Sequence, residues 1–325
     1  MPERVIIDTD PGIDDALALI LALRSPELEV VAVTTVSGNV PVDVATRNVL
    51  TVFSVLSLTE PPPVARGSSK PLKKAPVFAT SIHGEDGLGG LYEIRDTSGH
   101  PRYTPLSLER SNRDAADEIL FHLSSKPESL TLITLGPLTN IATAIKRDGS
   151  AMRGVKGIVL MGGAVTVPGN VTAAAEFNIH ADPEAARIVL DSGMPLTMVG
   201  LDVTRRVRLD RETVEKKIGP CKTTVSQFVC DCTRQLFSMS QDRGGNSSFP
   251  LHDPLAVGVA LDPSLVCSKP MHIEVETKGR LTEGMTMADR RPVGEKASGS
   301  PNAQVCLDVD ASRFLSLFLE RLCRE

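Results

Sequence analysis

The chain has 325 residues and a formal net charge of −5, with acidic and basic side chains interspersed along its length. This balance argues against nucleic acid or an anionic membrane surface as a partner, and a small neutral molecule fits better. The apolar run Ala16 to Leu23 is too short to span a bilayer and its acidic flank is unlike a signal peptide, so we expect a cytoplasmic protein.

Short runs rich in β-branched residues alternate with segments of helical period from residue 4 to residue 199. The predicted strands are Arg4–Thr9, Leu28–Val36, Val64–Ala65, Leu130–Leu135, Val155–Met161 and Leu196–Val199. The predicted helices are 14–24, 42–56, 113–123, one that follows Pro137, and one that Asp182 caps. This alternation is typical of βαβ units. We therefore predict an α/β fold with an open, doubly wound, mostly parallel sheet flanked by helices.

The last third of the chain has a weaker strand signal. The prediction here is helix over 210–241, a loop over 244–250, a helix from Pro254, strands at 271–277 and 303–309, and a terminal helix over 311–322. No break in composition marks a linker, so residues 1–325 are expected to form a single domain.

The six cysteines are Cys221, Cys230, Cys232, Cys267, Cys306 and Cys323. They show neither paired CxxC spacing nor a histidine at zinc-finger distance, so we predict reduced thiols rather than a disulfide framework.

Residues 8–16, DTDPGIDDA, place four aspartates directly after the first predicted strand. Ligands of open α/β sheets bind at such strand ends. Two carboxylates about 4 Å apart repel by about 4 kcal/mol at an effective dielectric of about 20. A helix cap and a turn would use one acid each, which leaves two acids unexplained. The all-oxygen set therefore predicts a hard cation, Ca²⁺ or Mg²⁺.

Further motifs follow in a fixed order. The full set is VIIDTDPGIDDALAL at 5–19, VSGNV at 36–40, HGEDGLGG at 83–90, LGPLTNIA at 135–142, MGGAV at 161–165, GN at 169–170, AEFNIHADPEAA at 175–186 and LHDPLAV at 251–257. Together they resemble the inosine-uridine preferring nucleoside hydrolase family over nearly the whole chain. The resemblance implies an enzyme that hydrolyses the N-glycosidic bond of purine or pyrimidine ribonucleosides to base and ribose, and a homodimer or homotetramer.

The resemblance also implies a set of site residues. A Ca²⁺ ion would be held by Asp10, a bidentate Asp15, Asp253 and the backbone carbonyl of Leu135. The implied ribose contacts are Asp14, Asn39, Met161, Asn170, Glu176, Asn178 and Asp253. The histidines that match the base pocket are His83 and His252.

The chemistry of N-ribosidic cleavage gives these residues roles. An ion on the 2'- and 3'-hydroxyls would orient the sugar, and a water on the same ion would pass its proton to Asp10, the expected general base. The carboxylates favour the positively charged sugar of the transition state. His252, beside Asp253, could protonate the departing base. His83 could equally belong to a mobile lid.

Base preference is the least determined property. The sequence has no tryptophan and two tyrosines, which disfavours a purine enzyme that stacks the base between tryptophans. Phe177 and the segment between Phe237 and Phe249 are candidates for the base wall, with Gln241 or Arg243 as hydrogen-bonding partners of the base. Inosine and uridine both stay open, with a broad or pyrimidine-leaning preference slightly favoured.

Two other functions fit part of the pattern. Asp8-Thr9-Asp10 is similar to the motif of haloacid dehalogenase-type phosphatases, with Asp8 as nucleophile, but Gly12 stands where that motif has Thr or Val. A nucleoside-binding protein without turnover would keep the pocket, and the intact acidic and histidine residues argue against it.

Overall fold

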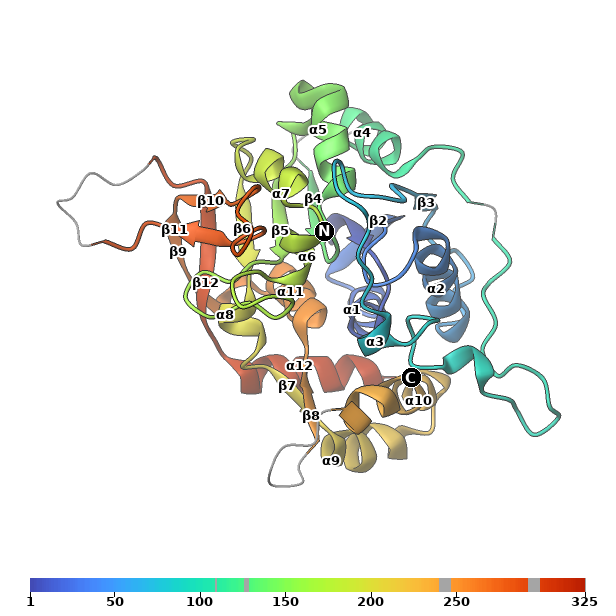
Figure 1. Cartoon of the computed structure of the whole chain (residues 1–325). Coiled ribbons are helices and arrows are strands. Elements are labelled where there is room, and N and C mark those ends of the chain that lie inside the picture. Colours follow the sequence, from blue (N-terminus) through green and yellow to red (C-terminus); the bar gives the residue numbers. More distant parts are fainter. Residues whose placement is uncertain (109, 126–128, 240–246, 292–298, 325) are drawn as a thin grey trace.

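The computed structural model describes residues 1–108, 110–125, 129–239, 247–291 and 299–324 (Figure 1). These residues build a sheet of eight strands in the order β3-β2-β1-β4-β5-β6-β12-β9. The strands are β1 (Glu3–Thr9), β2 (Leu28–Thr35), β3 (Val64–Arg66), β4 (Leu130–Thr134), β5 (Gly157–Met161), β6 (Leu196–Val199), β9 (Val266–Met271) and β12 (Ala303–Val309). All neighbours pair in parallel except β9, which runs antiparallel to β12. The strand order reverses between β1 and β4, which makes this the topological switch point.

Helices cover both faces of the sheet (Figure 1). Alternate residues of a strand face opposite sides, so Val5 and Ile7 join one apolar cluster and Ile6 joins the other. The first cluster is closed by α1 (Ile13–Leu23), α2 (Val42–Val55), α10 (Thr224–Met239), α11 (His252–Leu261) and α12 (Ala311–Cys323). The second is closed by α4 (Ala115–Ser125), α5 (Thr139–Met152) and α7 (Pro183–Leu190). The predicted α/β, doubly wound architecture is confirmed.

Shorter elements connect these layers. They are the helical turns α3 (Thr80–His83), η1 (Leu91–Glu93), α6 (Phe177–Ala181), α8 (Leu201–Thr204), α9 (Arg211–Thr213), η2 (Val214–Ile218), η3 (Gly219–Cys221) and η4 (Pro263–Leu265), and the paired strands β7 (Arg208–Asp210) with β8 (Ser248–Pro250) and β10 (Ile273–Val275) with β11 (Thr286–Ala288). Of the loop predicted over 244–250, residues 244–246 lie outside the described residues, and the prediction is wrong for residues 248–250, which form β8 by pairing with β7. Within the described residues, no helix combines the length and apolar character needed to cross a bilayer. The single-domain organisation stays a prediction.

The strand predicted over 271–277 is wrong in its bounds. The chain forms β9, which ends at Met271, and β10, which lies within the predicted range, and His272 separates them. β9 is an edge strand, and the side chains of its four middle residues, Cys267 to Pro270, are exposed. Lys269 and Pro270 suit such an edge, but they remove the apolar alternation on which a strand prediction depends.

The prediction that all six cysteines are reduced is also wrong. Cys221, at the end of η3, forms a disulfide with Cys323, at the end of α12, and their Cα atoms are 5.7 Å apart. The two residues are separated by 102 positions, so spacing in the sequence could not reveal that the fold brings them together. The other four are free thiols, as predicted.

A buried carboxylate joins the segment before α4 to helix α10. Asp231, 1 % exposed, accepts hydrogen bonds from Tyr103 (2.8 Å), Arg102 (3.0 Å), Gln227 (3.1 Å) and Arg234 (2.6 Å). In Asp231→Asn an amide N–H₂ would face two of these donors. We expect this variant to lose about 2 kcal/mol of stability, measured as a lower midpoint in urea. An unchanged midpoint would show that the four bonds contribute nothing net.

Candidate active site

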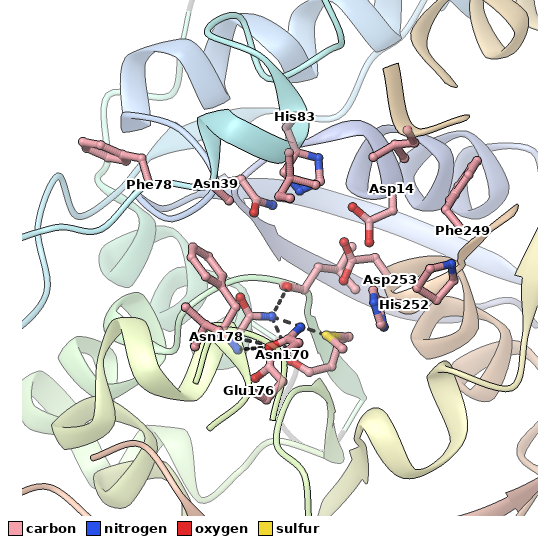
Figure 2. Close-up of a pocket in the computed structure, with 18 of the residues that line it drawn as sticks. Asp14, Asn39, Phe78, His83, Asn170, Glu176, Asn178, Phe249, His252 and Asp253 are labelled. Atoms are coloured by element: carbon pink, nitrogen blue, oxygen red, sulfur yellow. Dashed lines mark hydrogen bonds between the residues drawn. The ribbon is translucent and has the colours of Figure 1, made fainter. Parts of the chain in front are cut away.

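A pocket of about 440 Å³ opens at the carboxyl ends of the strands, near the switch point between β1 and β4 (Figure 2). Eleven of the residues singled out in the sequence line it: Asp14, Asn39, His83, Leu135, Met161, Asn170, Glu176, Phe177, Asn178, His252 and Asp253. They come from loops and helix starts far apart in the chain. Asp10 and Asp15 are fully buried (0 % exposed) and are not among the lining residues.

Asp15 closes the loop between β1 and α1. Its Oδ1 accepts from the Thr9 hydroxyl (2.6 Å), and its Oδ2 accepts from the Gly12 N–H and the Asn39 side chain (both 3.0 Å). The capping interpretation is therefore correct for this residue. Burial, followed by repulsion from Asp14, nevertheless raises the pKa of Asp15. The carboxylate thus combines a structural role with charge that needs a counter-ion.

Asp10 has one oxygen engaged and one without a partner. Its Oδ2 accepts from the Asn39 backbone N–H at 2.5 Å, whereas the buried Oδ1 has no hydrogen-bond partner. Gly38 and Gly136 enclose this carboxylate so closely that a Cβ at either position would overlap it. Burial, and then Asp15, raise the pKa of Asp10 well above its usual range. A buried, unsatisfied acidic oxygen is costly unless a ligand meets it.

Asp14, Asp15 and Asp253 place carboxylate oxygens within 4.8 Å of one another, close enough to hold one metal ion. Asp253 stands in the first turn of α11, and burial followed by repulsion from Asp14 raises its pKa well above the usual range. Burial raises the pKa of Asp14 to about 6. Like charges that are concentrated where water is excluded favour a bound cation. Asp10 lies outside this three-residue group, although Asp15 acts on it electrostatically.

The far wall of the pocket is held by hydrogen bonds before any ligand arrives. Asn178 Nδ2 donates to the Leu135 carbonyl (2.6 Å) and is 3.2 Å from the Met161 carbonyl (Figure 2). The Glu176 carboxylate caps α6 by accepting from the backbone N–H groups of Asn178 and Ile179. Glu176 is only 2 % exposed, so it is not a solvated surface charge.

Residues 176–178 do not alternate as an extended loop would. Because α6 begins at Phe177, the side chains of Glu176, Phe177 and Asn178 all line the pocket. Asn170 lies at the rim, where its side-chain oxygen accepts from the Phe177 N–H at 2.9 Å. This arrangement makes Phe177 available as part of the base wall.

Two histidines flank the acidic floor (Figure 2). His83 Nδ1 accepts from the Ile13 N–H at 3.1 Å, and burial lowers the pKa of His83 to about 4. His252 Nδ1 lies 2.7 Å from the Thr204 hydroxyl. The loss of solvent around the ring, followed by the positive charge of Arg205, lowers the pKa of His252 to about 3. Both rings are therefore neutral at pH 7, and each can donate one N–H.

Asp8 does not face the pocket. Its Oδ1 accepts from Thr34 on the neighbouring strand β2 (2.5 Å) and from Asn140 on α5 (2.7 Å), and the residue is 1 % exposed. A nucleophile of the haloacid dehalogenase type must reach its substrate. The contacts of Asp8 therefore give no support to the phosphatase alternative.

The mouth of the pocket is apolar, and most of it was not foreseen. Val77, Phe78, Ile82 and Val171 line the opening with exposed side chains, and Leu236 and Phe249 line its interior. Only Phe249 lay within the segment expected to form the base wall. For Val77, Phe78 and Ile82, the signal in the sequence was a group of apolar residues just before the motif that contains His83, in a stretch without helical or strand periodicity. Gln241 and Arg243 lie outside the described residues.

Fold and pocket together define an α/β enzyme with an acidic site for a small polar molecule. Comparison with known proteins identifies its family. The model of the inosine-uridine preferring nucleoside hydrolase family matches residues 5–316. The pyrimidine-specific ribonucleoside hydrolase RihA of Citrobacter koseri is 38% identical over 319 residues, which cover 98% of this chain and 97% of the relative.

Comparison with solved structures indicates the same family. A plant nucleoside hydrolase, PpNRh1, is 33% identical with a TM-score of 0.89 and full coverage of both chains (100%). The purine-preferring ribonucleoside hydrolase from Gardnerella vaginalis is 33% identical with a TM-score of 0.88, covering 99% of this chain and 98% of its own. The chain belongs to the inosine-uridine preferring nucleoside hydrolase family, and it is an enzyme of the N-glycosyl hydrolase type.

Proposed function

We propose that this enzyme hydrolyses the N-glycosidic bond of ribonucleosides to free base and ribose, with Ca²⁺ as cofactor and Asp10 as general base. The observation that carries the proposal is the convergence of buried aspartates on one pocket at the switch point of the sheet. Among the described residues that line this pocket, none is Lys or Arg, so no side chain there neutralises the acids.

The donor set fits a hard cation. Asp15 and Asp253, together with Asp10 and the Leu135 carbonyl, would hold the ion, with Asp14 close by. All of these donors are oxygens, which suits Ca²⁺ with its six to eight ligands. When bound, the ion would orient the vicinal hydroxyls of the sugar and increase the acidity of a water.

We assign to Asp10 the role of taking the proton of the attacking water. The Asn39 N–H occupies its Oδ2, so Oδ1 is the oxygen that accepts. Direct attack of water on the sugar needs no covalent intermediate.

The wall of Asn170, Glu176 and Asn178 holds the sugar. Its side chains are already fixed by hydrogen bonds to the backbone, so little conformational freedom is lost when ribose binds. The negative charges of Glu176 and the aspartates favour a sugar that becomes positive as the bond to the base breaks.

His252 is assigned to the leaving base. Its neutral ring donates an N–H to the base as negative charge develops there, as neutral imidazoles can in other enzymes. Phe177, Phe249 and Leu236 supply an apolar wall for the ring of the base. We propose a broad preference that leans to pyrimidines. RihA is pyrimidine-specific by name, and the Gardnerella enzyme is purine-preferring by name.

The test is a panel of ribonucleosides and 2'-deoxyribonucleosides, with free base and reducing sugar as readouts. We expect turnover of uridine and inosine, and kcat/KM lower by about a hundredfold or more for the 2'-deoxy compounds, because each lost hydroxyl leaves buried polar groups unpaired. Equal turnover of the deoxy compounds would contradict the hydroxyl contacts. Binding of ribonucleosides without base release would instead favour the non-catalytic alternative. The cytoplasmic location and the homodimer or homotetramer stay predictions.

A further inference from the structure

The buried hydroxyl of Thr204 lies against the ring of His252. Thr204 Oγ1 is 2.7 Å from His252 Nδ1, across 48 positions of sequence, and Thr204 is completely buried (0 % exposed). Because this hydroxyl engages Nδ1, Nε2 is the ring nitrogen left to meet a ligand in the pocket that His252 lines (Figure 2).

The segment that carries Thr204 is fixed on both sides. The Asp202 carboxylate accepts from two backbone N–H groups of residues 165–166, at 2.9 and 2.6 Å. Arg205 donates to the two carbonyls of residues 168–169, at 2.8 and 2.6 Å. Thr204 therefore lies between two residues, Asp202 and Arg205, that are hydrogen-bonded to the loop before Asn170. These contacts fix the position of its hydroxyl.

We propose that Thr204 is a positioning residue for His252, an assignment that rests on the proposed function. By donating its hydroxyl proton to Nδ1, Thr204 fixes the plane of the ring and keeps the ring proton on Nε2. In this tautomer Nε2–H points to the base and donates to it as the bond between sugar and base breaks. Thr204 is not among the residues that line the pocket, so it acts on the base only through His252.

The test compares two leaving groups in purified full-length enzyme. Uridine and inosine release bases that need a hydrogen-bond donor, whereas para-nitrophenyl ribofuranoside releases a stable anion that needs none. Thr204→Val removes the hydroxyl and keeps the shape of the side chain. We expect kcat for the nucleosides to fall about tenfold to a hundredfold with little change in KM, and kcat for the nitrophenyl compound to stay close to wild type.

Two further variants separate positioning from folding. Thr204→Ser keeps a hydroxyl and is expected to recover most of the nucleoside activity. Thr233→Val removes another buried hydroxyl, which donates to the Val229 carbonyl within α10 at 2.7 Å. This variant is expected to leave kcat unchanged for both the nucleosides and the nitrophenyl compound. In the double variant Thr204→Val/His252→Ala, the loss on nucleosides should equal that of His252→Ala alone, since both act through one ring.

The outcomes distinguish this assignment from the activity itself. Equal losses on nucleosides and on the nitrophenyl compound, or no loss on either, would overturn the role of Thr204 while the hydrolase function stands. A wild-type enzyme that releases neither base nor nitrophenol would overturn the proposed function, and the Thr204 assignment with it.

Discussion

Replacement of Asp10 by asparagine is expected to lower kcat for ribonucleosides by about a thousandfold or more. The loss of a general base accounts for most of this decrease, and weaker binding of the cation lowers kcat further. The Asn39 N–H donates to Oδ2, so the amide oxygen of the variant would take that place. Its N–H₂ group would then occupy the position of Oδ1. A donor there can neither accept a proton nor approach a cation, although the side chain keeps its shape.

The enclosure of Asp10 adds a second expectation. Asp10→Glu keeps the charge but should recover little activity, because Gly38 and Gly136 leave no space around the carboxylate. Asp231→Asn is the matched control, since it neutralises another buried aspartate that does not line the pocket. The measurement is base release by each of the three variants, and circular dichroism checks that each variant is folded. An Asp10→Asn enzyme with more than a tenth of wild-type kcat would remove Asp10 from the mechanism.

The layered fold could be predicted because its signals are local. Parallel strands such as β1 and β4 are rich in β-branched residues. Asp182 caps α7 through its contact with the Ala185 N–H, as its position before Pro183 indicated. Short elements such as β7 and β8 have no such signal. Each consists of three residues, and each exists only because its partner from elsewhere in the chain lies beside it.

The sequence predicted which residues belong to the site, but it did not predict how they are arranged. Asn39 falls in the pocket because it follows β2 and the strand ends of a parallel sheet meet at one edge, whereas Asp253 reaches the pocket from the first turn of α11. The sequence did not show that Asp15 is shared between loop closure and the acidic cluster, or that Asp8 points away from it. Contacts between distant residues, such as Thr204 with His252, depend on packing that no local pattern records.

Removal of divalent metal is expected to lower base release by about a hundredfold or more, and Ca²⁺ should restore it better than Mg²⁺. Without a cation the oxygens of Asp14, Asp15 and Asp253 face one another within 4.8 Å, so binding also relieves repulsion in the folded state. Saturating Ca²⁺ should raise the melting temperature by roughly 5 °C, because the ion binds the folded state only.

Two variants show whether this shift comes from the acidic cluster. Asp253→Asn should abolish the rise in melting temperature, and it is preferred to Asp15→Asn because Asp15 also holds the loop through Thr9 and Gly12. His252→Ala should lower kcat yet keep the full thermal shift, since its ring donates to the base and holds no ion. Full activity in enzyme shown by elemental analysis to carry no metal would contradict the cation site, whatever the thermal data. A shift that survives Asp253→Asn would place the ion elsewhere.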